Sequence, residues 1–399
     1  MRLSDRIQRI KPSATLAVAA RAAAMRRSGV DIISLTLGEP DFPTVPAAKA
    51  AGHQAIDEDF TRYTPVKGFP ELVEGVAGWV SERYAVSVAP EQVVVSSGAK
   101  QCLYDLAVSL WQEGDEIVIF SPYWVSYPDQ ARLVGATPVV VRTRPEDGFR
   151  IPMDDLRAAI NDRTVAIVLN NPSNPTGTVL PREDVEGIAA LAVQHDLTIV
   201  ADSIYDPLVY DGAVAVNPLS LGDEVAAQTC LVHGVSKAYA MTGWRIGFLV
   251  APPAVAAACA KVQGQCTSNP CSVSQRAALG ALTGSQDPVE TMRRTYGERR
   301  EWLVQRAAGI PGLDVGRPPR GAFYLFPSVT RLLGRTTPSG RELTTSVDVS
   351  EYLLVEGKVA SVPGAAFGED SCIRFSYAAA MDELERAFDR IEALLRPWV

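Results

Sequence analysis

Residues 164–207 read TVAIVLNNPSNPTGTVLPREDVEGIAALAVQHDLTIVADSIYDP, and this segment decides the fold. It begins with an apolar run, 164–172, continues through an amphipathic stretch, 182–195, and ends with a second apolar run, 197–203. Continuous apolar strands separated by helices are typical of a parallel sheet that is buried on both faces. The segment therefore predicts a strand–helix–strand unit of an α/β sheet.

The same alternation extends to both sides of this unit. Further strands are expected at 91–97, 116–122, 137–143, 230–236 and 245–252, with a helix at 99–111. After about residue 285 the pattern changes to a long charged helix, three short strands and an amphipathic closing helix, expected at 289–308, 321–327, 359–364, 372–378 and 381–397. We expect a large α/β domain (46–288) with a mostly parallel seven-stranded sheet flanked by helices. A smaller α+β domain (289–399) follows, joined by the N-terminal segment (1–45), which includes a helix at 13–28 that stops at Gly29.

Composition excludes several classes of protein. The chain has 399 residues and a formal net charge of −8, without a block of basic residues, which argues against nucleic-acid binding. No apolar run approaches the ~18 residues of a membrane span, and the N-terminus lacks a signal-type apolar stretch, so we expect a cytoplasmic protein. The six cysteines form no CxxC pair and the three histidines share no metal spacing, so reduced thiols and no metal site are expected.

Lys237 is one of only seven lysines and lies just past a predicted strand, in HGVSKAYAMTGWRIG (233–247). Ser236 precedes it, and Arg245 follows eight residues later. A lysine that forms a Schiff base needs a site where its amine can be neutral, and a phosphorylated cofactor needs hydroxyls and a guanidinium. The alternative for Lys237 is a surface lysine on a loop.

Three polar segments follow predicted parallel strands: SSGAK (96–100), NNPSNPTG (170–177) and ADSIYDP (201–207). The carboxyl ends of such strands are where α/β sheets bind ligands. Gly98 allows the backbone to approach a phosphate at a helix N-terminus, and Asp202 can keep a pyridine nitrogen protonated. The alternatives are a helix cap or salt bridge for Asp202 and an ordinary Asn-Pro turn in the second segment.

Taken together, these motifs resemble the class I aminotransferases of fold type I, and within them the bacterial aspartate aminotransferase branch. The resemblance covers nearly the whole chain. The segments that carry it are RIKPSATLAVAARA, LGEPDFPT, YTPVKGFPEL, SSGAKQ, PYWVSYP, NPSNPTG, VSKAYAMTGWRIGF, TSNP, GAFYLF, VPGAAFG and IRFSYA. It implies an aminotransferase with ping-pong kinetics whose large domain binds pyridoxal 5′-phosphate.

The resemblance also assigns contacts to the cofactor. Lys237 is expected to hold it covalently and to move the substrate's α-proton, while Asp202 pairs with the ring nitrogen. Tyr63 is expected to reach the phosphate of the neighbouring subunit's cofactor, which implies a homodimer with shared active sites. The remaining contacts are expected from Trp124 on the ring, Asn174 and Tyr205 at the phenolic oxygen, and Ser236, Arg245, Gly98 and Ala99 at the phosphate.

For the substrate, the resemblance implies that Arg374 grips the α-carboxylate, because arginine's planar fork suits a two-pronged pair better than lysine. Gly38, Trp124 and Asn174 are expected to line the same pocket. The plainer alternatives are core packing for Trp124 and a strand salt bridge for Arg374, and, for Tyr63, an ordinary turn aromatic.

At the far end of the pocket, Ser13, Thr15 and Lys100 resemble the group that receives a side-chain carboxylate. They predict aspartate or glutamate as substrate, although Ser13 can also cap a helix and Lys100 can be solvated. Lys11 resembles a basic residue linked in some relatives to prephenate, so a prephenate or aromatic amino acid aminotransferase is the alternative.

Two residues depart from the family pattern, Ser203 where glutamate is usual and Cys271 after TSNP. Two other functions use the same scaffold. One is a pyridoxal-phosphate lyase or decarboxylase. The other is a ligand-sensing domain of a transcription regulator, which would need a DNA-binding segment. We expect no such segment, because the resemblance begins within the first dozen residues.

Overall fold

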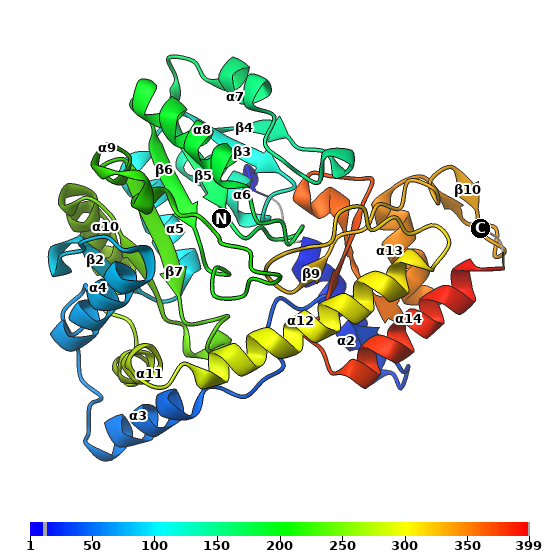
Figure 1. Cartoon of the computed structure of the whole chain (residues 1–399), viewed down its shortest axis with the longest axis horizontal. Helices are drawn as coiled ribbons and strands as arrows, with labels where there is room; N and C mark the ends of the chain where they lie inside the picture. The colour runs from blue at the N-terminus through cyan, green and yellow to red at the C-terminus, as the bar shows by residue number, and fades with distance from the viewer. Residues whose placement is uncertain (11–13, 398–399) are drawn as a thin grey trace.

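The computed structural model describes residues 1–10 and 14–397, without the side chains of residues 14–16 (Figure 1). Its centre is a seven-stranded sheet in the order β2-β8-β7-β6-β5-β3-β4. The strands are β2 (Val93–Ser96), β3 (Glu116–Ser121), β4 (Thr137–Arg142), β5 (Thr164–Asn170), β6 (Thr198–Asp202), β7 (Thr229–Gly234) and β8 (Gly247–Val250). Each lies within a range that the sequence predicted, apart from an extra residue at the start of β7.

One strand runs against the others. β8 pairs antiparallel with both β2 and β7, whereas the pairs β3–β4, β3–β5, β5–β6 and β6–β7 are parallel. The connection from β7 to β8 therefore turns back at the edge where the parallel strands end. This turn brings Lys237 and Arg245 to the same edge as the ends of β5 and β6.

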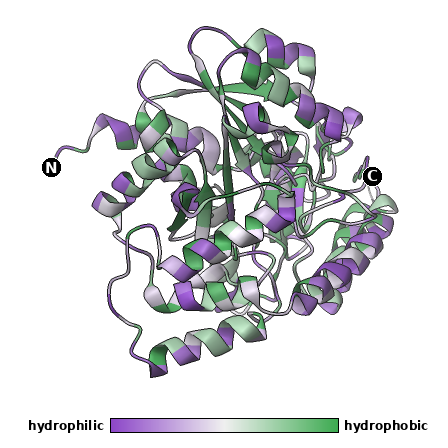
Figure 2. Cartoon of the chain, turned by 60° about the vertical axis from the view of Figure 1, so that its left-hand side comes forward, coloured by the Kyte–Doolittle hydropathy of each residue, from purple (hydrophilic) through white to green (hydrophobic). Residues whose placement is uncertain are grey.

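Helices cover both faces of the sheet, as the continuous apolar strands predicted. On β6, Val200 packs into the cluster under α5, α6 and α10, while Ile199 and Ala201 pack into the opposite cluster under α7 and α8. Figure 2 shows the strands as a hydrophobic band inside helices of mixed polarity. These helices are α3 (Pro46–Asp57), α4 (Pro70–Tyr84), α5 (Ala99–Leu110), α6 (Ser126–Val134), α7 (Met153–Ala159), α8 (Arg182–Gln194), α9 (Asp223–Ala226), α10 (Pro253–Cys266) and α11 (Ser272–Thr283).

The C-terminal part has a core of its own. The long helix α12 (Asp287–Ala308) runs from beneath the sheet to this part, where α13 (Ser346–Val355) and α14 (Met381–Leu395) lie (Figure 1). A three-stranded antiparallel sheet has the order β13-β14-β9. Its strands are β9 (Tyr324–Leu325), β13 (Val362–Pro363) and β14 (Ile373–Ser376). A separate antiparallel pair, β10 (Arg335–Thr336) and β11 (Glu342–Leu343), packs against α13.

The N-terminal segment packs on this second core. β1 (Ile33–Ser34) pairs in parallel with β12 (Val359–Ala360), and Ile33 and Leu35 belong to the same hydrophobic cluster as β14 and α14. Two further helices precede β1, α1 (Asp5–Gln8) and α2 (Ala14–Arg27). We therefore propose the division into a large domain, 46–288, and a small domain, 289–399, joined by 1–45.

Two further expectations from the sequence concern the cysteines and membrane-spanning helices. Cys102, Cys230, Cys259 and Cys372 are buried free thiols, whereas Cys266 and Cys271 are exposed. Among the described residues, no helix is both long and apolar enough to span a membrane.

Candidate active site

A cavity of about 410 Å³ opens at the carboxyl edge of the large sheet. It collects polar side chains from strand ends that are far apart in the sequence, which agrees with the expected position of a ligand in an α/β sheet. The predicted site residues that line it are Gly38, Ala99, Lys100, Trp124, Asn174, Asp202, Tyr205, Ser236, Lys237, Arg245 and Arg374.

Lys237 lies at the bottom of this cavity, in the turn between β7 and β8. Its Nζ donates a hydrogen bond of 2.5 Å to the backbone oxygen of Gly38 and lies 5.9 Å from the ring centre of Tyr205. Burial lowers the pKa of the Lys237 amine to about 8, and the nearby positive charge of Arg374 acts in the same direction. A neutral amine is therefore accessible near physiological pH, as a nucleophile or proton carrier requires.

Asp202 is the last residue of β6, and its side chain is 4% exposed. Its carboxylate accepts a hydrogen bond of 2.7 Å from the hydroxyl of Tyr127 and one of 3.3 Å from the backbone N–H of Ile204. Burial raises the pKa of Asp202, and the Tyr127 hydrogen bond opposes that rise. Tyr127 was missed as a site residue by the sequence reasoning, although it lies in the quoted segment PYWVSYP.

Tyr205 links the site to the C-terminal part of the chain. Its hydroxyl lies 2.9 Å from the hydroxyl of Tyr324, which belongs to β9 in the C-terminal part. A side chain at Gly38 would meet the same Tyr324 hydroxyl at 2.7 Å, so only glycine fits there without displacement. Tyr324 was also missed, and its signal was the segment GAFYLF.

Arg374, on β14, is 4% exposed. Its Nη1 donates to Oδ1 of Asn174 at 2.9 Å, and its Nη2 donates to the backbone oxygen of Thr36 at 2.7 Å. The guanidinium carbon lies 4.4 Å from the ring centre of Tyr324. Nε is buried and has no hydrogen-bond partner among the described residues. A buried donor without a partner is costly, so this arginine is suited to an anion that enters the cavity.

Glycines shape the end of the cavity where α5 begins. Gly98 has a φ of 91°, and a side chain there would collide with the guanidinium of Arg245. A side chain at Gly247 would collide with the backbone N–H of Ala99. The first N–H groups of α5, the Arg245 guanidinium and the Ser236 hydroxyl therefore converge, which is an arrangement that binds phosphate.

Lys100, the second residue of α5, lines the cavity close to this end. Its Nζ lies 4.8 Å over the ring centre of Trp124, and burial followed by repulsion from Arg245 lowers its pKa. No carboxylate of the described residues forms an ion pair with it. Of the other predicted residues here, Lys11 and Ser13 lie outside the described residues, and Thr15 belongs to α2 without a described side chain.

The structure places three other residues away from this cavity. Tyr63 is 90% exposed and does not line it. The Ser203 hydroxyl is buried and accepts a 2.9 Å hydrogen bond from Asn217. Ser203, which departs from the family pattern, is not among the residues that line the cavity. Cys271 is exposed at the start of α11 and is not among the lining residues.

The chain is similar to known proteins along almost its entire length. A family model described as aminotransferase class I and II matches residues 30–391. The aspartate aminotransferase of Bacillus sp. (strain YM-2) is 39% identical over 395 residues, which cover 99% of each chain. The probable aspartate/prephenate aminotransferase of Thermus aquaticus is 42% identical over 397 residues, again 99% of each chain.

Solved structures agree with this similarity. The aspartate aminotransferase from Rhizobium meliloti superposes with a TM-score of 0.96 at 39% identity, over 99% of both chains. The aspartate aminotransferase from Thermus thermophilus with maleate superposes with a TM-score of 0.92 at 40% identity, over 99% of this chain and 100% of the other.

Proposed function

The chain belongs to the class I and II aminotransferases, and from this premise we propose that it moves an amino group between aspartate or glutamate and a 2-oxo acid, with pyridoxal phosphate held by Lys237. The single observation that carries the proposal is the placement of Lys237, Asp202 and Arg374 around one cavity of about 410 Å³. These residues supply an amine, a buried carboxylate and a carboxylate-binding guanidinium.

The cavity fits the cofactor that the family uses. When bound, pyridoxal phosphate supplies an aldehyde that binds amines covalently and a ring that withdraws electrons from the substrate's α-carbon. Ser236, Arg245 and the N–H groups after Gly98 would hold the phosphate, and Asp202 would pair with the ring nitrogen. Tyr205 and Asn174 would donate to the phenolic oxygen, and Trp124 would cover one face of the ring.

Lys237 is the group that moves the proton. With the cofactor and substrate bound, the free Lys237 amine would be placed to take the proton from the substrate α-carbon and to return it. Its pKa of about 8 keeps part of the amine neutral at pH 7. Arg374 holds the α-carboxylate through a charge-assisted pair, which fixes the α-carbon beside Lys237.

A dicarboxylate preference rests on Lys100. Its ammonium lies over Trp124, lines the cavity and has no carboxylate partner among the described residues. A charge-assisted hydrogen bond contributes roughly 1.5–3 kcal/mol, or about one to two decades in specificity. The solved structure of the Thermus thermophilus aspartate aminotransferase with maleate, a dicarboxylate, supports this proposal.

The first experiment tests the cofactor and the reaction. Borohydride reduction followed by peptide mapping should place the pyridoxyl group on Lys237, and label on another lysine would refute the assignment. A half-reaction with amino acid alone should yield pyridoxamine phosphate. A lyase or decarboxylase would consume the amino acid without forming it.

The second experiment tests the substrate. We expect kcat/KM to be higher for aspartate than for alanine, phenylalanine and arginine, and we expect Lys100→Ser to remove that preference. The reading of the pocket fails if the native enzyme shows no preference or if the variant keeps it. Prephenate remains a second candidate acceptor, because relatives from Thermus aquaticus and Aquifex aeolicus are named probable aspartate/prephenate aminotransferases.

A homodimer with shared active sites completes the proposal. The Tyr63 side chain is 90% exposed on a single chain, which is unusual for a tyrosine unless a partner covers it. Two-fold assemblies are also the commonest oligomers. Light scattering should give twice the chain mass, and a fully active monomer would refute the shared site.

A further inference from the structure

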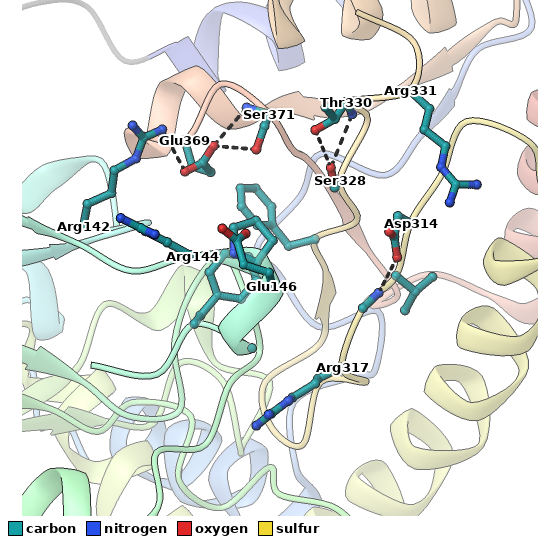
Figure 3. A pocket seen from close by; sticks show the side chains of 16 residues that line it. Arg142, Arg144, Glu146, Asp314, Arg317, Ser328, Thr330, Arg331, Glu369 and Ser371 are labelled. Atoms are coloured by element: carbon teal, nitrogen blue, oxygen red, sulfur yellow. Dashed lines mark hydrogen bonds and ion pairs between the residues drawn. The ribbon is translucent and has the colours of Figure 1, made fainter. Parts of the chain in front are cut away.

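A second cavity, of about 790 Å³, lies outside the active site, between the edge of the large sheet and the C-terminal part (Figure 3). Its walls come from the end of β4 with the 3₁₀ turn Pro145–Asp147, from the loop after α12, and from the segments that flank β9 and precede β14. Four arginines line it, namely Arg142, Arg144, Arg317 and Arg331, and we call it the arginine cavity. Its size is within the ~300–1,000 Å³ range of small-molecule sites.

Three of these arginines form no ion pair among the described residues. Arg142 is paired with the buried carboxylate of Glu369 at 3.2 Å. Arg144, Arg317 and Arg331 are exposed, and their guanidiniums form no ion pair or hydrogen bond among the described residues. Surface arginines usually find a neighbouring carboxylate, as many others on this chain do, so three unpaired guanidiniums around one cavity favour an anion from outside.

The four arginines outnumber the three carboxylates that line the cavity, which leaves a formal charge of +1. Glu369 is occupied by Arg142 and by the hydroxyl and N–H of Ser371, the latter at 3.1 Å. Asp314 accepts the backbone N–H of Gly316 at 3.0 Å, and Glu146 is exposed on the 3₁₀ turn. Figure 3 shows Glu369 held between Arg142 and Ser371.

One arginine is held in place by close backbone packing. Gly148 ends the 3₁₀ turn with a φ of 67°, and a side chain at this position would collide with the stem of Arg317. The stem therefore lies against backbone from the large sheet, although Arg317 belongs to the C-terminal part. Such packing reduces the side-chain freedom that binding an anion would otherwise remove.

Aromatic side chains connect the arginine cavity to the substrate site. Phe149 and Phe326 line the cavity with ring centres 5.9 Å apart, and Phe326 lies 5.9 Å from the ring of Phe367. The guanidinium carbon of Arg374 lies 5.0 Å from the centre of that same Phe367 ring. A ligand that shifts Phe326 would therefore also shift Phe367, whose ring packs against the guanidinium of Arg374.

We propose that the arginine cavity binds a small organic polyanion, carried by phosphoryl or carboxylate groups, and that its occupancy changes how Arg374 holds the substrate carboxylate. The guanidiniums of Arg144, Arg317 and Arg331 supply the anion contacts. Phe149 supplies an apolar wall. Because the walls belong to both parts of the chain, the ligand bridges them. The effect on Arg374 rests on the proposed function, whereas the binding of the polyanion does not.

The binding test is calorimetry on the cofactor-loaded protein with pyrophosphate, citrate and ATP as separate probes. We expect saturable binding of at least one probe. Binding of pyrophosphate but not citrate would assign phosphoryl groups, the reverse would assign carboxylates, and tighter binding of ATP than of pyrophosphate would assign a role to the aromatic wall. Absence of saturable binding by all three overturns the proposal.

Variants locate the binding. Each of Arg144→Gln, Arg317→Gln and Arg331→Gln should weaken binding of the probe by about threefold, and the triple variant should abolish its binding. Arg27→Gln is the matched control, since Arg27 is also exposed and without an ion pair among the described residues, but lies on α2. Unchanged binding in the triple variant overturns the site. Circular dichroism and melting temperature check that each variant is folded.

The coupling test uses the same variants. With a saturating probe, we expect the KM for aspartate to change by more than about twofold in the native enzyme and to stay constant in the triple variant, whose basal kcat is unaltered. A constant native KM overturns the coupling clause. If the native protein transfers no amino group at all, the proposed function fails, while the calorimetric result still decides the binding clause.

Discussion

Two arginine environments in this chain differ in almost every respect. Arg374 is 4% exposed, and two of its nitrogens are already held by Asn174 and by the backbone oxygen of Thr36. Arg144, Arg317 and Arg331 are exposed, belong to separate loops and have no ion-pair partner among the described residues. The guanidinium of Arg374 is hydrogen-bonded and shielded from solvent, whereas the other three are exposed to solvent.

The difference shows what burial adds to a charge. A buried, pre-oriented guanidinium interacts with an anion in a low dielectric and loses little freedom on binding, so its removal is expensive. An exposed guanidinium is screened by water and salt and contributes less. We therefore expect large effects at the active-site cavity and small, salt-sensitive effects at the arginine cavity.

The largest effect is expected at Lys237. Lys237→Ala removes both the covalent attachment of the cofactor and the proton carrier, so kcat should fall by at least about 10⁴-fold. Steady-state transamination measures this loss. The matched control is Lys261→Ala, an exposed lysine on α10 that should keep native turnover. Turnover within tenfold of native in Lys237→Ala would contradict the role.

The next effect tests the fixed guanidinium itself. Arg374→Lys keeps the charge but cannot form the two-pronged pair, so kcat/KM should fall by about 10²-fold for every amino acid substrate. The parallel substitution Arg144→Lys, in the arginine cavity, should change kcat/KM by less than about twofold. Equal losses in the two variants would erase the distinction between the two environments.

A smaller effect concerns the pH dependence that burial gives to Lys237. Because the pKa of Lys237 is lowered to about 8, the neutral fraction of its amine falls by about tenfold for each pH unit below 8. Above about pH 9 nearly all of the amine is neutral. The initial rate at which cofactor-free protein reacts with pyridoxal phosphate should follow this curve and level off above pH 8 to 9. A rate that keeps rising towards pH 10.5 would mean that the amine is not desolvated.

The smallest effect concerns salt. Raising NaCl from 50 to 500 mM should weaken polyanion binding at the exposed arginines several-fold, because screening acts most strongly on solvated charges. The KM for alanine, whose single carboxylate pairs with Arg374, should change less, since Arg374 is shielded from the solvent. Calorimetry gives the Kd of the polyanion, and steady-state kinetics in the same buffers give the KM. An equal salt response at both sites would count against the contrast.

Much of the fold and of the site was predictable from local sequence. The apolar strands and their helices have distinct periods, so their order follows from the pattern. The seven strands of the large sheet lie within or one residue beyond the predicted ranges, whereas the two-residue strands β1, β10 and β11 were not predicted. The carboxyl ends of neighbouring parallel strands share one edge, so Asn174, Asp202 and Lys237 were expected together before any contact was known. Resemblance to the family added Arg374 and Tyr205, which no local pattern assigns.

Other features depend on contacts that no local pattern encodes. Tyr324 meets Tyr205 across 119 residues, and Arg374 meets Asn174 across 200, because the C-terminal part packs against the carboxyl edge of the large sheet. The pKa of Lys237 depends on the burial that this docking produces, and the arginine cavity exists only where three distant loops meet. The sequence by itself determined which elements form and which chemical groups end them, since those depend on neighbours along the chain. Tertiary structure alone decided burial, pairing and cavity shape, since these depend on neighbours in space.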